Sequence, residues 1–221
     1  MRAGSLLQQK AGEKCGLELW LIRHGETDWN RERRWQGQSD PPLNELGQQQ
    51  AKTLVSRLAE QTFDQIYSSD LIRAQETATL ACPNTAIVAE PRLREMHFGA
   101  FEGQRWDDLK ADHSETLAAW RRSPYEFRPP DGEHYQDMAD RVLEWYGALP
   151  ADGRIAAVVH GGVLRALLYS ITGVPLATQW AFTLDNAGIS IVERHRDMTL
   201  IRTVNDTAHL GNLQALSDAP E

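Results

Sequence analysis

The chain has 221 residues, of which 41% are hydrophobic and 24% are charged, a composition that suits one globular domain. Its formal net charge of −8 argues against a broadly basic surface, so we expect neither nucleic acid nor an anionic membrane as a partner. No stretch approaches the roughly 18 apolar residues of a membrane span, and residues 1–16 lack the apolar core of a signal peptide, which predicts a cytoplasmic location.

Strand and helix patterns alternate along the first half of the chain. In order, we predict a strand at 17–23, a helix at 45–61, a strand at 63–69, a helix at 70–81 and a strand at 85–90. Asn44 is a suitable N-cap for the first of these helices, because its side chain can accept a hydrogen bond from the first turn.

The second half continues the alternation after a longer helical region. We predict helices within 106–150, interrupted by SPYEFRPPDGE, then a strand at 154–160, a helix from Gly161 to about Ile171, and strands near 188–193 and 198–203. The run at 154–160 is almost continuously apolar, which is typical of a central strand buried on both faces. The alternation predicts an α/β layered fold with a mainly parallel sheet.

Three of the predicted strands end at polar or glycine-containing turns. These turns are Arg23-His24-Gly25, Ser68-Ser69 shortly before Arg73, and His160-Gly161-Gly162. Ligand sites of open parallel sheets lie beyond the carboxyl ends of the strands, so we expect the turns to converge on one pocket. Two arginines, two histidines and the free N–H groups of a helix start suit a phosphate group.

The same turns fall within four longer blocks, RHGETDWN, SSDLIRAQET, LREMHFGAFEG and VVHGGVLRALL. In this order, over about 17–192, the blocks resemble the signature of the histidine phosphatase superfamily, which includes the cofactor-dependent phosphoglycerate mutases. The resemblance implies that His24 is a nucleophile that becomes transiently phosphorylated and that Glu95 is the proton donor. It further implies His160 as the second pocket histidine, and phosphate contacts from Arg23, Asn30, Arg73 and Gly161.

The resemblance also implies a three-layer α/β/α sandwich around the mainly parallel sheet. We expect a single domain at 17–204 that includes a helical cap-like insertion at about 96–150. An N-terminal extension at 1–16 and a polar C-terminal tail at 205–221 would flank it.

The chemistry of phosphate esters agrees with these roles. Phosphate monoesters hydrolyse very slowly in water, and a covalent phosphohistidine divides the reaction into two easier steps. A neutral His24 would attack phosphorus while arginines neutralise the phosphate oxygens. Glu95 would protonate the leaving alkoxide and then deprotonate the water that hydrolyses the intermediate. Such a reaction needs no cofactor and no metal.

Two other classes of function compete with a histidine phosphatase. His24, His160 and Glu95 could surround a metal ion, although two arginines nearby would repel a cation and no HxH or HExxH spacing is present. A non-catalytic module that binds a phosphorylated ligand could share the fold, although every position that catalysis needs is filled. Hydrolysis of an aryl phosphate with and without a chelator separates the three.

Within the superfamily, the sequence favours a phosphatase over a phosphoglycerate mutase. His160 is followed by two glycines, as in many phosphatases, whereas mutases place Asn after His-Gly and carry a longer insertion before this block. PPDGEHYQDMADRV also resembles a phosphatase block that usually reads Gly-Glu-Ser, with His134 in place of the serine. WRRS at 120–123, in contrast, resembles the mutases.

We expect the substrate to be a small phosphorylated metabolite. Sugar phosphates, phosphoglycerate derivatives and ribazole phosphate all fit a pocket with arginine walls and aromatic edges. The family also includes many dimers, which makes a homodimer compatible with the resemblance. The residues chosen as determinants of specificity are Gln36, Gly37, Trp106, Arg121 and Arg122.

Overall fold

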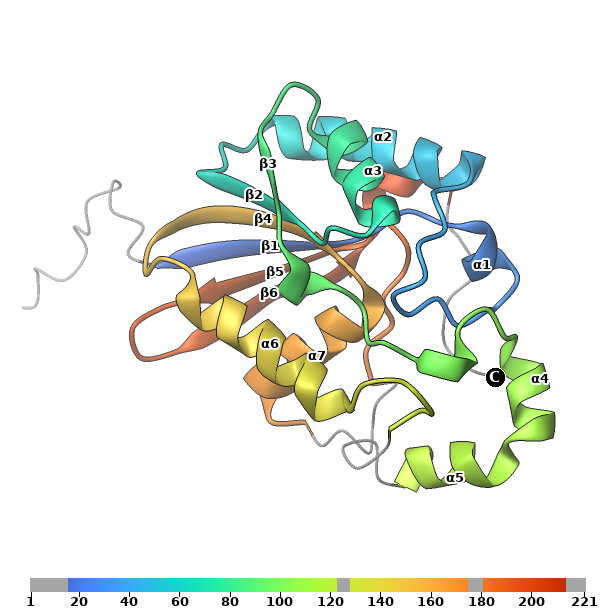
Figure 1. Ribbon diagram of the computed structural model, residues 1–221. Helices are drawn as coiled ribbons and strands as arrows, with labels where there is room; N and C mark the ends of the chain where they lie inside the picture. The colour runs from blue at the N-terminus through green and yellow to red at the C-terminus, as the bar shows by residue number, and fades with distance from the viewer. Residues whose placement is uncertain (1–15, 123–127, 175–180, 214–221) are drawn as a thin grey trace, which may run out of the picture.

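The computed structural model describes residues 16–122, 128–174 and 181–213, which build a central sheet with helices on both sides (Figure 1). The sheet has six strands in the order β3-β2-β4-β1-β5-β6. These are β1 (Leu17–Arg23), β2 (Gln65–Ser68), β3 (Ile87–Ala89), β4 (Gly153–Val159), β5 (Ile189–Arg194) and β6 (Thr199–Asp206). The first four strands run parallel, while β5 is antiparallel to β1 and β6 is antiparallel to β5. The predicted mainly parallel sheet is confirmed.

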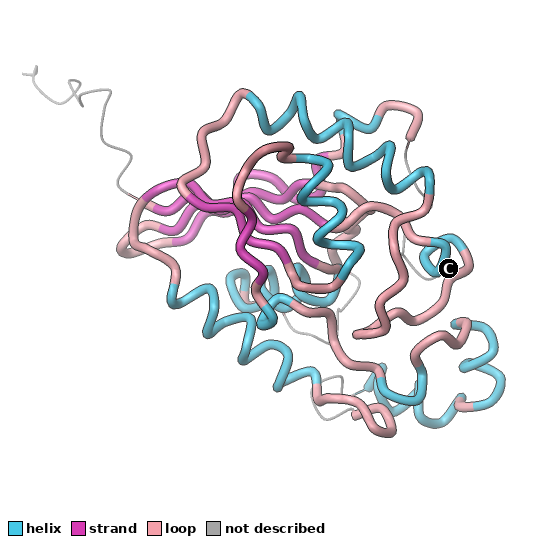
Figure 2. Tube along the Cα trace, turned by 45° about the horizontal axis from the view of Figure 1, so that its top comes forward, coloured by secondary structure: helices cyan, strands magenta, loops and turns pink. Residues whose placement is uncertain are grey.

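Two pairs of helices cover the two faces of the sheet (Figure 2). One pair is α2 (Glu45–Ala59) with α3 (Ile72–Ala81), and the other is α6 (Tyr135–Ala148) with α7 (Gly161–Thr172). Asn44 caps α2 as predicted, because its Oδ1 accepts a hydrogen bond from the backbone N–H of Gly47 at 2.8 Å. The three-layer α/β/α sandwich is therefore confirmed.

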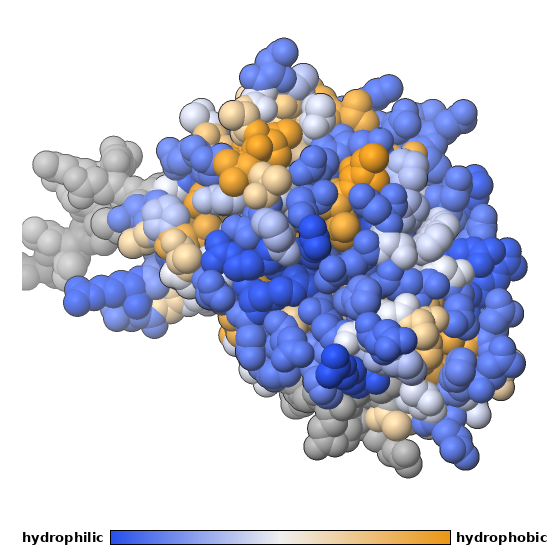
Figure 3. All heavy atoms as spheres, viewed as in Figure 1, coloured by the Kyte–Doolittle hydropathy of each residue, from blue (hydrophilic) through white to orange (hydrophobic). Residues whose placement is uncertain are grey.

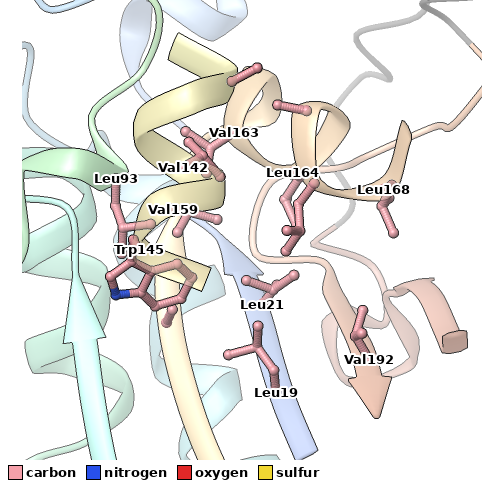
Figure 4. Packing of buried hydrophobic residues seen from close by; sticks show 14 of the residues in the cluster. Leu19, Leu21, Leu93, Val142, Trp145, Val159, Val163, Leu164, Leu168 and Val192 are labelled. Carbon is pink, nitrogen blue, oxygen red and sulfur yellow. The ribbon is translucent and has the colours of Figure 1, made fainter. Parts of the chain in front are cut away.

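The side chains of β1 alternate between the two faces because successive residues of a strand point in opposite directions. Leu19 and Leu21 lie in a buried cluster with α6 and α7, which Figure 4 shows from close by. Trp20 and Ile22 lie in a second cluster with α2 and α3 on the other face. Burial on both faces explains the continuous apolar runs at 19–22 in β1 and at 155–159 in β4.

The chain between β3 and β4 contains the predicted helical region. It runs through the 3₁₀ turns η1 (Pro91–Leu93) and η2 (Gly99–Phe101), then α4 (Trp106–Asp112), α5 (Ser114–Arg122) and α6. Phe101, Leu109 and Leu117 form a small buried cluster of their own here. In Figure 1, α4 and α5 lie on the side of the sheet toward which β1 runs. No helix among the described residues is long and apolar enough to cross a membrane.

The packed chain continues past residue 204, where the sequence predicts a polar tail to begin. β6 extends to Asp206, and a 3₁₀ turn, η4 (Ala208–Leu210), follows it. Leu210 is buried in the cluster beneath α2, and the backbone carbonyl of Leu213 accepts a hydrogen bond from Gln50 of that helix at 2.9 Å. The sequence places the end of the packed domain too early because these apolar residues are isolated and form no periodic pattern. Tertiary packing nevertheless holds the segment against the domain.

Candidate active site

The histidines of two separate sequence blocks meet at the carboxyl ends of β1 and β4. These strands are parallel neighbours with Arg23 opposite Val159, so the residues that follow them, His24 and His160, lie side by side. The backbone N–H of His24 donates to the carbonyl of Val159 at 3.0 Å, and the two imidazole centroids are 5.1 Å apart. The register of the sheet thus brings the two residues together.

His24 has a defined tautomer. Its Nδ1 lies 2.7 Å from the carbonyl oxygen of Gly25, and because a carbonyl can only accept, Nδ1 carries the proton and donates it. Burial, followed by the charges of Arg73 and Arg23, lowers the pKa of His24 well below its usual value. The ring is therefore neutral at physiological pH, with its lone pair on Nε2, the form that a nucleophilic histidine requires.

The loop that carries His24 is held by the first turn of α2 and by α3. A Cβ on Gly25 would lie 2.5 Å from the carbonyl oxygen of Gly47, so only a glycine allows the two backbones to approach this closely. The N–H of Gly25 donates to the hydroxyl of Thr77 on α3 at 3.0 Å. The glycine of the RHG motif therefore fixes the position of the histidine beside it.

His160 is fully buried, and neither of its ring nitrogens has a hydrogen-bond partner within the described part of the chain. Burial, then the charges of Arg73, His24 and Arg23, lowers its pKa well below the usual value, so this ring is also neutral. A buried polar side chain without a partner is costly unless a ligand satisfies it. Its place at the start of α7 adds the free N–H groups of the helix to the same spot.

Arg73 is fully buried at the start of α3 and is held by a neighbouring loop. Its Nη1 donates to the carbonyl of Ser39 at 2.8 Å and its Nη2 to the carbonyl of Gly37 at 2.7 Å. Its Nε is buried and has no hydrogen-bond partner in the described residues. Burial lowers the pKa of Arg73 to about 10 despite the nearby carboxylates, so the side chain stays charged at neutral pH.

The second arginine and two asparagines belong to the segments next to His24. Arg23 donates from Nη1 to the carbonyl of Leu184. Asn186, in the same loop as Leu184, donates from its amide to the carbonyl of His24 at 3.0 Å. Asn30 is the third residue of the short helix α1 (Asp28–Arg31), where its Oδ1 accepts from the backbone N–H of Thr27 at 3.1 Å. Because Oδ1 already accepts this hydrogen bond, Asn30 can interact with a ligand through its NH₂ group, as a donor.

Glu95 reaches the site from the loop after η1. Its Oε2 accepts from the N–H of Gly162 at 2.9 Å, and its Oε1 accepts from the N–H of Met96 at 2.8 Å. A Cβ on Gly162 would overlap Oε1, so the second glycine of the HGG block makes room for this carboxylate. A Cβ on the preceding Gly161 would lie 3.1 Å from Nη1 of Arg165 and 3.7 Å from Nε of Arg23, so this glycine lies beside two arginines.

The structure describes the side chains of only some of the residues expected to determine specificity. Gln36 is 9% exposed with its Oε1 buried and without a hydrogen-bond partner among the described residues, and Gly37 supplies the carbonyl that holds Arg73. Trp106, Arg121 and Arg122 lie on α4 and α5, but their side chains fall outside the described residues.

Sequence reasoning missed three charged residues that support this site. Glu102 accepts hydrogen bonds from the backbone N–H groups of Gln38 and Ser39, next to the carbonyls that hold Arg73. Arg141 and Glu133 form an ion pair at 2.8 Å beside the loop of Glu95. Glu102 falls within one of the recognised blocks and Glu133 follows the glycine of another, yet charged residues at such positions are usually read as solvated.

Comparison with known proteins agrees with this geometry. The family model of the histidine phosphatase superfamily (branch 1) matches residues 19–207, which include every residue placed in the site above. The chain belongs to the histidine phosphatase superfamily. Membership in this superfamily makes it an enzyme of the phosphatase or mutase type, as the resemblance implied. No group of three or more histidine, cysteine, aspartate or glutamate residues in the described ranges could hold a metal ion.

Relatives of this histidine phosphatase carry both mutase and phosphatase names. The probable phosphoglycerate mutase GpmB of Escherichia coli is 38% identical over 209 residues, covering 88% of this chain and 95% of that protein. The α-ribazole phosphatase from Shigella flexneri superposes with a TM-score of 0.75 at 32% identity, covering 86% of this chain and 96% of that one. A mycobacterial glucosyl-3-phosphoglycerate phosphatase in complex with VO3 gives 0.75 at 31% identity, covering 86% and 99%.

Proposed function

We propose that the protein hydrolyses the phosphate monoester of a small metabolite through a phosphohistidine on His24, with water as the final acceptor. The observation that carries this proposal is the state of His24, a buried neutral imidazole whose Nδ1–H is occupied by the carbonyl of Gly25. Such a ring directs the lone pair of Nε2 away from its own backbone, beside His160 and two arginines.

In the first step, Nε2 of His24 forms a bond to phosphorus as the bond from phosphorus to the ester oxygen breaks. Arg73 and Arg23 neutralise the phosphoryl oxygens, and the Nε–H of Arg73 is a buried donor available for one of them. His160 can donate from a ring nitrogen to another oxygen, which would satisfy a group otherwise buried without a partner. The NH₂ group of Asn30 would supply a further donor.

In the proposed sequence, Glu95 handles the protons of both steps. As a carboxylic acid it gives its proton to the leaving alkoxide, which departs as an alcohol. The resulting carboxylate then takes a proton from the water that attacks phosphorus and breaks the bond to Nε2. The products are the alcohol and inorganic phosphate, and both His24 and Glu95 return to their starting states.

Trapping of the intermediate tests this proposal. Rapid quenching with a radiolabelled aryl phosphate should yield an acid-labile label on His24, and His24→Ala should carry no label and show no turnover. Turnover should also survive extensive chelation, because arginines rather than a metal supply the positive charge. Label on another residue, or activity that a divalent ion restores after chelation, would overturn the mechanism.

A phosphoglycerate mutase is the second candidate, because the GpmB relative at 38% identity carries that name. The phosphatase is preferred because of the glycine after His160-Gly161 and the phosphatase names among the structural neighbours. With 3-phosphoglycerate and a bisphosphoglycerate primer, we expect free phosphate to form faster than 2-phosphoglycerate. Isomerisation that outpaces hydrolysis would assign the protein to the mutases. A panel of phosphorylated metabolites would then rank the substrates.

A further inference from the structure

Arg141 of α6 binds the backbone of the segment that leads into Glu95. Its Nη1 donates to the carbonyls of Arg92 at 2.7 Å and of Arg94 at 2.6 Å. Its Nη2 donates to the carbonyl of Glu95 itself at 2.9 Å and to Oε1 of Glu133 at 2.8 Å. One guanidinium group therefore fixes three carbonyls within four consecutive residues, because its fork of donors can reach several acceptors at once.

Glu133 holds the other side of the same loop. Its Oε1 also accepts from the backbone N–H of His97 at 2.9 Å, and its own N–H donates to the carbonyl of His97 at 2.9 Å. The side chains of Arg141 and Glu133 are each 19% exposed, so water competes only weakly for these bonds. The backbone is thus tied on both sides of Glu95, at residues 92–95 and at residue 97.

The base of this clamp is a helix anchored in the core. Val142 and Trp145 of α6 are buried beneath the loop, and Figure 4 shows them near Leu93, the last residue of η1. Arg141 therefore extends from a helix packed in the core to a loop that lacks the regular backbone hydrogen bonds of a helix or a sheet. The charge of Arg141 also contributes, as the smallest of the named causes, to lowering the pKa of His160.

We propose that Arg141, held by Glu133, is a positioning residue for Glu95. It fixes the loop backbone so that the carboxyl group of Glu95 lies where it can pass a proton to the leaving group. This inference rests on the proposed function, because it assigns to Arg141 an effect exerted only through Glu95. The side chain of Glu95 is tied to Gly162 and Met96, but both bonds depend on where the loop backbone lies. A loop displaced by a fraction of an ångström would move the proton donor away from the ester oxygen.

The test compares single-turnover phosphorylation of His24 by two substrates of similar shape, 4-nitrophenyl phosphate and phenyl phosphate. The nitrophenolate leaves with little help from a proton, whereas the more basic phenolate needs one. Arg141→Lys keeps the charge but loses the fork, so the rate with phenyl phosphate should fall roughly tenfold or more, and the rate with 4-nitrophenyl phosphate should change little.

Arg194 provides a matched control. It also donates to three backbone carbonyls, those of Tyr146 at 2.6 Å, Leu149 at 2.8 Å and Pro150 at 2.8 Å. It pairs with Leu17 at the start of β1, the opposite end of that strand from Arg23. Arg194→Lys should therefore leave both rates unchanged, so any loss specific to Arg141→Lys reflects its location rather than the chemistry of the substitution.

A double variant separates an effect through Glu95 from an independent one. In the Glu95→Gln background, Arg141→Lys should cause no further loss with phenyl phosphate, because the group it positions is already disabled. If Arg141→Lys does not fold, Glu133→Gln, which preserves shape but weakens the clamp, should show the same dependence on the leaving group. An equal loss with both substrates, or additive losses in the double variant, would refute the positioning role. These outcomes leave the proposed function standing, because its own test in this series is the single variant Glu95→Gln, which contradicts the role of Glu95 if it shows no dependence on the leaving group.

Discussion

Gly162 lacks a side chain at the point where the carboxylate of Glu95 meets the start of α7. A Cβ there would overlap Oε1, so Gly162→Ala should push the proton donor away without touching His24 or the arginines. We expect hydrolysis of poor leaving groups to fall roughly 10- to 100-fold, part of the usual contribution of a general acid. Steady-state rates with phenyl phosphate and 4-nitrophenyl phosphate measure this loss.

Gly147 on α6 offers the control for that substitution. A Cβ on Gly147 would meet nothing within 4 Å, so Gly147→Ala should keep full activity and stabilise the helix by up to about 1 kcal/mol. If Gly162→Ala keeps full activity, as expected for Gly147→Ala, then the carboxylate of Glu95 does not need the space left by the missing side chain of Gly162.

The tautomer of His24 can be observed directly. Nitrogen-15 NMR of the histidine side chains should show Nδ1 of His24 protonated and Nε2 bare, with no titration near pH 6.5, because burial and two arginines lower its pKa well below that value. A midpoint for His24 near 6.5 would contradict the buried neutral nucleophile.

The elements that carry the site differ in how well the sequence predicts them. β1, β4 and α7 are predicted because an apolar run and a glycine turn are local signals. α1 was missed although Thr27 and Asn30 form a capping box, because the helix has only four residues and no apolar face. The contacts of Arg141 and Glu102 could not be predicted from the sequence. Both side chains bind backbone groups that are far away along the chain, and such contacts produce no regular spacing of residue types.

Glu102 links two loops, one of which holds Arg73. Its carboxylate accepts from the N–H groups of Gln38 at 3.0 Å and Ser39 at 2.7 Å, and from that of Phe98 at 3.0 Å. Glu102→Gln replaces one acceptor oxygen with an NH₂ group that faces these donors, so the loop that holds Arg73 should loosen. We expect weaker binding of inorganic phosphate, with its inhibition constant raised roughly tenfold, a change of about 1.4 kcal/mol.

Competitive inhibition by inorganic phosphate measures this effect, and Glu144→Gln is its control. The side chain of Glu144 is 73% exposed and pairs only with Arg92 among the contacts described, so its loss should leave the inhibition constant unchanged. A fall in kcat with unchanged affinity for phosphate would place the action of Glu102 elsewhere than on the Arg73 loop.

At the scale of the whole molecule, a net charge of −8 coexists with a site that we propose to bind a phosphate dianion. The face in Figure 3 is mostly hydrophilic, with hydrophobic side chains in separate spots. Acidic side chains pair with arginines at many places on the surface, for example Asp70 with Arg94 and Glu193 with Arg202. Arg23 and Arg73, in contrast, are buried, where a positive charge acts on a ligand with little screening. A preference for anions at the proposed site would therefore depend on these buried arginines rather than on the net charge.

The same burial should make the folded state sensitive to mild acid. His24 and His160 have folded pKa values well below 6.5, whereas the unfolded chain binds protons on both rings once the pH falls through about 6.5. Because the unfolded state then holds more protons, the free energy of unfolding decreases with falling pH, by up to about 1.4 kcal/mol per pH unit for each histidine. The loss begins near pH 6.5 and continues down to the folded pKa values. Carboxylates that pair with arginines, such as Asp70, lose their contribution only at lower pH.

Urea unfolding at a series of pH values between 7 and 5 would measure this slope. The double variant His24→Gln/His160→Gln removes both titrating groups, so its free energy of unfolding should depend on pH less steeply by about two protons. His209 also has a pKa lowered by burial and remains in the variant, so part of the slope should persist. His209→Gln alone should therefore remove a smaller share than the double variant does. An identical slope in the wild type and the double variant would mean that the two site histidines have the same pKa in the folded and unfolded states, which would contradict the buried neutral nucleophile.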